Sequence, residues 1–160
     1  MTIKYNNVFI EDAYTICGNY ENDGPLSKYF DKKYEKDLYF GEKSWEQAEV
    51  HLLKEANTNI LKKNKLKEED IDLLISGDVQ NQIAASNYMA REFNIPFLGI
   101  FEACSTSGEG LAIGSTYIEG GFAKRILVST SSHNMAAEKQ FRNPTEYGTP
   151  KPKTATFTST

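Results

Sequence analysis

The sequence predicts a layered α/β fold with a mixed, mainly parallel sheet. β-prone apolar runs alternate with segments of helical periodicity along residues 8–130, which is the pattern of βαβ units. Each predicted helix lies between two predicted strands, and parallel pairing requires such a crossover. The composition, 39% hydrophobic and 25% charged over 160 residues, is that of an ordinary globular protein. We therefore expect one domain over residues 1–160.

The first predicted elements are a strand over residues 8–16 and a helix that begins after Ser44. Ser44 can cap this helix, and Gln47 stands where a capping box requires Glu or Gln. Apolar residues then recur at helical spacing, at Trp45, Ala48, Leu52, Ala56 and Ile60. The connection over residues 20–41 is long, polar and aromatic, so we expect it either to have a role of its own or to cover the core.

Three further strands follow, over residues 71–76, 96–101 and 125–130. They are short runs rich in Ile, Leu, Val and Phe, which predicts buried strands. Helices are predicted between them, over residues 82–93 and from a sharp turn at 102–108 to about Gly120. Beyond the last strand, we expect a short helix over 134–140, a proline-containing loop over 143–153 and a β-prone run over 154–160. The chain is expected to be cut inside or just after that final strand.

Charge and composition argue against several classes of protein. The net charge of −4 is spread over interspersed acidic and basic residues, so we expect neither a nucleic-acid partner nor a polybasic membrane anchor. No apolar run is long enough to cross a bilayer, and residues 1–10 do not resemble a signal peptide. The two cysteines match neither a disulfide framework nor a zinc spacing, which favours a reducing compartment and no metal site.

Polar residues follow three of the predicted strands. In open α/β sheets, ligands bind beyond the carboxyl ends of the strands, so these residues could converge on one crevice. They are Asp78, Asn81 and Gln82; then Cys104, Ser105, Thr106 and Ser107; and finally Ser131, Ser132, His133 and Asn134.

Cys104 is the most informative of these residues. It lies between a predicted strand and a predicted helix, where the helix N-terminus favours a thiolate or a bound anion. A small buried hydrophobe is the alternative, and it is the stronger interpretation for Cys17. A cysteine nucleophile also needs a base. His133, at a strand end, is a better candidate than His51, which we expect on the helix surface, but no complete Cys–His site can be assembled from this sequence.

Residues 101–107, Phe-Glu-Ala-Cys-Ser-Thr-Ser, resemble the nucleophile turn of thiolases and ketoacyl synthases. More specific motifs resemble the stage V sporulation protein AD family, and together they span nearly the whole chain. They include Gly24-Pro25-Leu26, Ser44-Trp45-Glu46, Gly77-Asp78, Asn81-Gln82, Thr130-Ser131-Ser132-His133-Asn134, Gln140-Phe141-Arg142 and Pro144-Thr145-Glu146-Tyr147-Gly148.

This resemblance implies a thiolase-like fold, made of two similar halves in a chain about twice as long, of which these residues are the N-terminal half. It implies a binding protein rather than an enzyme. The expected ligand is dipicolinic acid (pyridine-2,6-dicarboxylate), which such proteins help to move into the developing spore together with other proteins of the same operon. A peripheral position at the spore inner membrane is a further expectation.

The resemblance places the ligand in the former active-site pocket. The expected contacts are Cys104, Ser105, Thr106, Asp78, Asn81, His133, Asn134 and Arg142. Asp78 could be a pocket wall, an orienting group or a calcium ligand, since dipicolinate chelates calcium; no other cofactor is expected. Two alternatives stay open, namely a thiolase-like acyl-transfer enzyme with Cys104 as nucleophile and a structural role among membrane partners. A half-fold would leave apolar surface uncovered, so we expect a homo-oligomer or dependence on the missing half.

Overall fold

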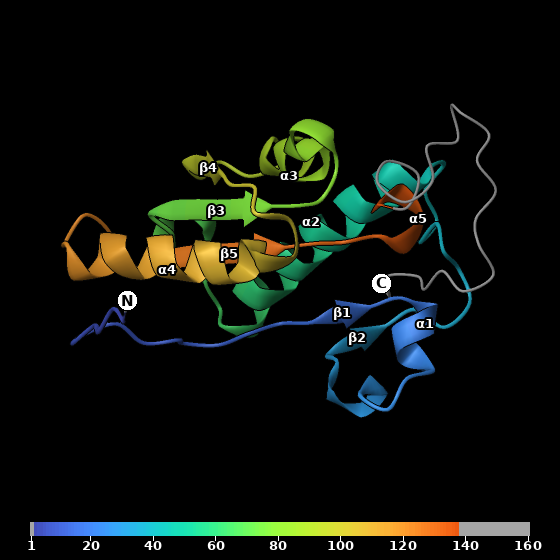
Figure 1. Ribbon diagram of the computed structural model, residues 1–160, viewed down its shortest axis with the longest axis horizontal. Helices are drawn as coiled ribbons and strands as arrows, with labels where there is room; N and C mark the ends of the chain where they lie inside the picture. Colours follow the sequence, from blue (N-terminus) through green and yellow to red (C-terminus); the bar gives the residue numbers. More distant parts are fainter. Residues whose placement is uncertain (1, 138–160) are drawn as a thin grey trace.

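A computed structural model describes residues 2–137 of the chain, and its centre is a three-stranded parallel sheet (Figure 1). The strand order is β4–β3–β5, with β3 at Leu73–Gly77, β4 at Phe97–Gly99 and β5 at Ile126–Thr130. In this register Ile75 lies opposite Leu98 on one side and Val128 on the other. The predicted α/β architecture with parallel strands is confirmed.

Helices cover both faces of this sheet. On one face, α4 (Thr106–Glu119) packs its small residues Gly110 and Gly114 against Ile75 and Val128. On the other face, Leu74 belongs to a core shared with α2 (Trp45–Lys63) and α3 (Ala84–Ala90). Side chains of successive strand residues point to opposite faces, so neighbouring residues of β3 pack against helices on opposite faces of the sheet.

The helix predicted after Ser44 is present as α2. The side chain of Ser44 accepts a hydrogen bond from the backbone N–H of Gln47 at 3.2 Å, which is the expected N-terminal cap. Of the predicted apolar face, Ala48 and Leu52 are buried, whereas Trp45, Ala56 and Ile60 are only partly buried. The buried face is turned toward Leu53 and Leu61, which the prediction did not include. It also includes the charged residue Glu49.

The strand predicted over residues 8–16 is wrong over most of its length. Only Ile16–Cys17 form a strand, β1, and it pairs in parallel with β2 (Lys32–Lys33) in a separate two-stranded sheet. Residues 8–15 instead line a cavity together with β5. They are held mostly through side chains, although the carbonyl of Thr15 also accepts from the backbone N–H groups of Asp31 and Lys32. Arg125 Nε donates to Glu11 Oε2 at 2.8 Å, and Lys63 Nζ donates to Asp12 Oδ1 at 2.9 Å.

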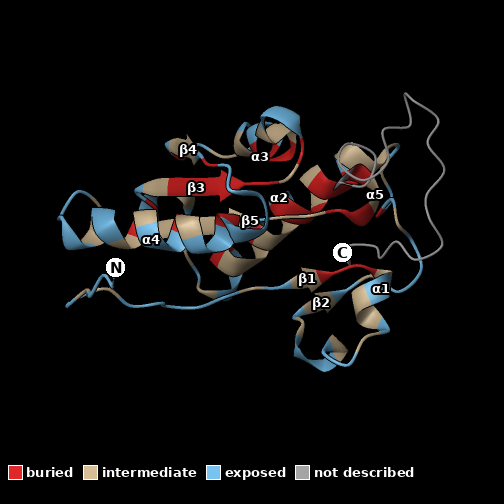
Figure 2. Ribbon diagram, in the orientation of Figure 1, coloured by how far each residue is buried: buried red, intermediate tan, exposed pale blue. Residues whose placement is uncertain are grey.

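The long connection between β1 and α2 covers part of the core. It contains the short helices α1 (Asn19–Asn22) and η1 (Ser27–Tyr29) as well as β2. Phe40 is buried against Ala48 and Leu52 of α2, whereas most of this connection is exposed (Figure 2). Covering the protein's own core, one of the two expected roles, is therefore confirmed for Phe40.

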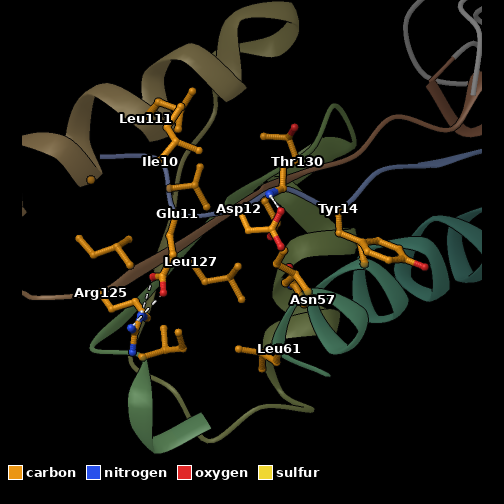
Figure 3. Close-up of a pocket in the computed structure, with 18 of the residues that line it drawn as sticks. Ile10, Glu11, Asp12, Tyr14, Asn57, Leu61, Leu111, Arg125, Leu127 and Thr130 are labelled. Atoms are coloured by element: carbon orange, nitrogen blue, oxygen red, sulfur yellow. Dashed lines mark hydrogen bonds and ion pairs between the residues drawn. The ribbon is translucent and has the colours of Figure 1, made fainter. Parts of the chain in front are cut away.

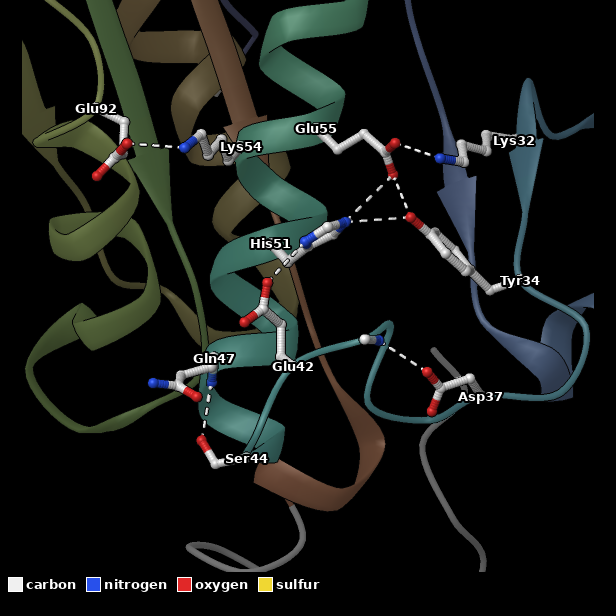
Figure 4. A network of polar contacts seen from close by, with 11 residues as sticks. Lys32, Tyr34, Asp37, Glu42, Ser44, Gln47, His51, Lys54, Glu55 and Glu92 are labelled. Carbon is white, nitrogen blue, oxygen red and sulfur yellow. Dashed lines mark hydrogen bonds and ion pairs between the residues drawn. The ribbon is translucent and has the colours of Figure 1, made fainter.

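A network of side chains fastens this connection to α2 (Figure 4). Tyr34 donates from its hydroxyl to Glu55 Oε2 at 2.8 Å and lies 3.2 Å from His51 Nε2. Lys32 is ion-paired with the same Glu55, and His51 Nδ1 lies 3.0 Å from Glu42 Oε1. His51, expected as a plain surface residue, is thus half-buried and bonded on both ring nitrogens.

The remaining elements are shorter than predicted. The helix expected over 82–93 is reduced to α3, because Gln82 and Ile83 have positive φ angles of 59° and 47° at the end of η3 (Asn81–Ile83). Two further 3₁₀ turns, η2 (Glu68–Asp70) and η4 (Ala103–Ser105), precede β3 and α4. The helix expected over 134–140 is seen as α5 (Asn134–Ala137); its remainder, the loop over 143–153 and the run over 154–160 lie outside the described residues.

Among residues 2–137, no helix combines the length and the apolar character needed to span a bilayer.

Candidate functional site

The carboxyl ends of β4, β3 and β5 meet at Gly77. Its carbonyl accepts a hydrogen bond from the backbone N–H of Ser131, which follows β5, at 3.4 Å. A Cβ atom on Gly77 would lie 2.3 Å from the carbonyl oxygen of Ile100 and 2.5 Å from Cγ2 of Thr106. The absence of a side chain at this position therefore lets the turn after β4 approach the end of β3.

The turn that carries Cys104 is held by its own side chains. Thr106 is buried; its hydroxyl donates to the carbonyl of Ala103 at 2.8 Å and accepts from the backbone N–H of Glu102 at 3.1 Å. Ser105 donates from its hydroxyl to the carbonyl of Glu102 at 2.9 Å. Ala103 has a φ angle of +48°, which a non-glycine residue adopts only when its surroundings enforce it.

Cys104 is exposed and lies in η4, the turn that leads into α4. Ser105, Ser107 and Gly108 around it are exposed as well. The first backbone N–H groups of an α-helix have no partner within the helix and carry a partial positive charge. This turn is therefore open to solvent and suited to an anion.

Asp78 lies directly after β3 and is buried. Its two carboxylate oxygens accept backbone hydrogen bonds from Gln80 at 2.9 Å and from Ser86 at 2.8 Å. These contacts fix the connection between β3 and α3. Asn81, in the same connection, is exposed.

His133 and Asn134 follow β5 and are fully buried. His133 donates from Nε2 to the carbonyl of Leu38 at 2.7 Å and accepts at Nδ1 from the backbone N–H of Met135 at 3.2 Å. Its ring stands edge-on to Phe40, and burial lowers the pKa of the imidazole. In this arrangement Leu38 and Met135 engage both nitrogens of a neutral ring, so His133, the better of the two candidate bases, is not paired with Cys104.

Glu49 is the residue of this region that sequence reasoning missed. It is fully buried and accepts hydrogen bonds from Gln80 Nε2 at 2.7 Å and from Ser131 Oγ at 2.8 Å. The pKa of its carboxyl is raised to about 7, chiefly by burial and also by the nearby charge of Asp78, while the hydrogen bonds oppose the rise. A signal was available, because position 49 lies four residues after Trp45 and three before Leu52, on the apolar stripe of the helix.

Two cavities lie away from the Cys104 turn. One, of about 650 Å³, runs between residues 8–15 and β5, with Leu61, Leu111 and Leu127 among its walls (Figure 3). The other, of about 940 Å³, lies along α2 and α3. Neither is lined by Cys104 or Asp78. Among residues 2–137 no group of three or more His, Cys, Asp or Glu side chains is placed to hold a metal ion, and Arg142 lies outside the described residues.

Comparison with known proteins adds to this geometry. A family model described as stage V sporulation protein AD matches residues 1–160. The chain is 52% identical over 153 residues to stage V sporulation protein AD of Bacillus subtilis (strain 168); the match covers 96% of this chain and 45% of that protein, so the chain spans less than half the length of this relative. Among solved structures it is similar to 3-oxoacyl-acyl-carrier-protein synthase III from Aquifex aeolicus VF5, with a TM-score of 0.49 and 20% identity, over 54% of this chain and 30% of that chain.

Proposed function

Since the chain belongs to the stage V sporulation protein AD family, we propose that it binds dipicolinic acid and aids the uptake of this acid into the developing spore. The observation that supports this best is the open turn at the start of α4. Cys104 and Ser105 are exposed there, and nothing lies within 4 Å of where a Cβ atom on Gly108 would stand. A planar dicarboxylate can approach such a helix N-terminus and accept hydrogen bonds from its backbone.

The described residues divide the proposed site into contacts and supports. Cys104, Ser105 and Asn81 are exposed and are the proposed contacts. Thr106 and Asp78 are buried and already hydrogen-bonded, so they support the turn and the connection after β3. Calcium, if it takes part, would arrive with the ligand that chelates it.

Binding is favoured over acyl transfer by the surroundings of the two histidines. A cysteine nucleophile needs a base within hydrogen-bond reach. His51 is held by Tyr34 and Glu42, and His133 is held by the carbonyl of Leu38. The acyl-transfer alternative would therefore depend on residues beyond those described.

Exposed apolar side chains support the proposal that this chain is covered by another unit, either a second copy or further residues of a longer protein. Leu111 and Tyr117 on α4 are 46% and 40% exposed, and Phe122, just after the helix, is 82% exposed. Large contiguous apolar patches on a protein surface commonly mark interfaces. We propose that the other proteins of the sporulation operon meet the complete assembly at the periphery of the spore inner membrane.

Calorimetric titration of dipicolinate, with and without calcium, tests the proposed function. It should be carried out on this chain and on a version extended to the full length of its relative. Binding by either supports the proposal, and binding by the longer version alone places essential groups beyond these residues. A lack of binding by both contradicts it, and acyl-thioester assays on Cys104 would then be the next experiment.

A matched pair of variants locates the site. Ser107→Glu adds a negative charge at the exposed turn, whereas Ala112→Glu adds the same charge at an exposed position further along α4. If the anion binds at the helix N-terminus, Ser107→Glu should weaken binding at least tenfold and Ala112→Glu should change it less than twofold, since electrostatic effects at helix ends are confined to about one turn. Equal effects of the two variants on affinity would indicate that the ligand binds elsewhere on the protein.

A further inference from the structure

We propose that Glu49 is a proton-linked positioning residue of the ligand site, and that a dicarboxylate binds most tightly when Glu49 carries a proton. This inference rests on the proposed function, because it needs an anionic ligand at the carboxyl ends of the strands. It concerns a side chain of α2 that lies beneath those ends rather than in the exposed turn itself.

The geometry makes Glu49 a tie between two loops. One carboxylate oxygen accepts from Gln80 in the connection after β3, at 2.7 Å. The other oxygen accepts from the hydroxyl of Ser131 in the segment after β5, at 2.8 Å, and the backbone N–H of His133 is a further donor. One buried side chain thereby fixes both loops to α2.

The two residues that donate to Glu49, Gln80 and Ser131, also bond the residues next to the proposed binding turn. Gln80 also donates its backbone N–H to Asp78, one residue beyond Gly77. Ser131 donates its backbone N–H to the carbonyl of Gly77. Gly77 in turn lies next to the side chain of Thr106, which belongs to the turn that carries Cys104. A change at Glu49 therefore reaches the turn through Gly77.

No cation balances this carboxylate within residues 2–137, where no ion pair joins Glu49 or Asp78 to a lysine, arginine or histidine side chain. Several charged and titratable groups lie on the elements packed around Glu49. They are Glu46, His51, Lys54, Glu55, Lys62 and Lys63 on α2, Asp78 after β3, Tyr88, Arg91 and Glu92 on and after α3, and His133 after β5. Of these, Lys54 and Glu92 pair with each other at the surface at 2.7 Å. Asp78 is the group whose charge raises the pKa of Glu49.

An incoming dianion adds negative charge of the same sign as Glu49 and Asp78. Because Glu49 and Asp78 are buried, water screens their charges less than it screens charges at the surface, so binding favours the protonated form of Glu49. The proton comes from solvent, with at most one taken up for each ligand bound. A protonated Glu49 can donate from one oxygen to the hydroxyl oxygen of Ser131 and still accept from Gln80 at the other, so the tie survives in both states with one hydrogen bond reversed.

The test is the pH dependence of dipicolinate binding between pH 6 and pH 9, for the unchanged protein, Glu49→Gln and Glu92→Gln. The carboxylates of the ligand stay ionised throughout this range. The dissociation constant of the unchanged protein should rise about tenfold from pH 6.5 to pH 8.5, as expected for coupling to one proton. Glu49→Gln imitates the protonated side chain and should bind with nearly constant affinity, while Glu92→Gln removes the same charge at the surface and should keep the dependence.

A second measurement tests the proposal without the Glu49→Gln variant, in case that variant does not fold. Titrations of the unchanged protein at pH 7.5 in buffers of different ionisation enthalpy count the protons taken up on binding. An uptake of at least half a proton supports the proposal, and an uptake near zero overturns it. If Glu49→Gln folds and keeps the full pH dependence, the role of Glu49 is overturned although the proposed function stands. Absence of binding at every pH contradicts both the role of Glu49 and the proposed function.

Discussion

The Cγ2 methyl group of Thr106 lies where a side chain on Gly77 would have to stand. This contact joins the turn that carries Cys104 to the end of the central strand. Both residues belong to segments that the sequence marked as candidate site, but their close approach is a property of the folded chain.

Gly77→Ala should therefore destabilise the protein by about 1 to 3 kcal/mol, the usual cost of forcing an extra methyl group into a packed site. The backbone carbonyl of Ile100 lies even closer to the new methyl group, and it cannot move aside as a flexible side chain can. Urea denaturation followed by circular dichroism measures this change in the free energy of unfolding. Gly108→Ala is the control, since open space surrounds Gly108 in the same helix; it should be neutral or stabilising by roughly 0.5 to 1 kcal/mol.

Stability should depend on pH through Glu49. Its pKa is raised in the folded protein from 4.5 to about 7, so between these values the folded chain holds a proton that the unfolded chain has released. The free energy of unfolding therefore falls as pH rises through this window, by up to about 1.4 kcal/mol per pH unit from this residue. Relative to the unchanged protein, Glu49→Gln should gain roughly 2 to 3 kcal/mol between pH 4.5 and pH 8. Urea denaturation at several pH values checks this, and a constant difference between the two proteins would contradict it.

The two cysteines should differ sharply in reactivity. Cys104 is exposed, whereas Cys17 is 1% exposed and burial raises the pKa of its thiol. Since the thiolate is the reactive form, we expect iodoacetamide to modify Cys104 at least about 100 times faster than Cys17. Mass spectrometry of the labelled peptides measures both rates in one sample. Dipicolinate should protect Cys104 and leave the rate at Cys17 unchanged; protection of neither would argue against a ligand at this turn.

Tyr34→Phe should loosen the connection between β1 and α2. The hydroxyl of Tyr34 bonds Glu55 and lies beside His51, and its loss leaves these half-buried groups with one partner fewer (Figure 4). We expect a loss of about 1 to 2 kcal/mol in stability and faster hydrogen exchange in residues 32–42. Tyr20→Phe, at a 53% exposed tyrosine of the same connection, is the control and should change neither.

The parts of the fold that the sequence predicted well are those determined by local pattern. The helix after Ser44 combines a cap with a regular apolar stripe, and its observed limits follow both. The strand ending at Gly77 is a buried run whose glycine marks its end. Residues 8–15 have the β-prone composition of a strand but are not paired with any strand of the described residues, and strand formation depends on pairing that composition does not reveal.

The candidate site shows the same division. Cys104 was placed correctly before a helix, because a strand-to-helix turn is visible in the sequence. The burial of His133 was not foreseen, since it depends on Leu38, a residue in a distant connection. Glu49 was overlooked because a charged residue on an apolar stripe is ordinarily assigned to the edge of that stripe, and only the packed structure shows it enclosed.

The hydrogen bond between His133 and Leu38 joins residues 95 positions apart. During synthesis on a ribosome, Leu38 emerges long before its partner exists. The carbonyl of Leu38 can therefore accept this hydrogen bond only after the third strand of the central sheet has been made. Contacts of such separation slow folding, because the intervening chain has to be ordered first. The contacts of Phe40 with α2 can form earlier, whereas its edge-on contact with His133 cannot. The contact between these two rings is therefore among the last parts of this core to close.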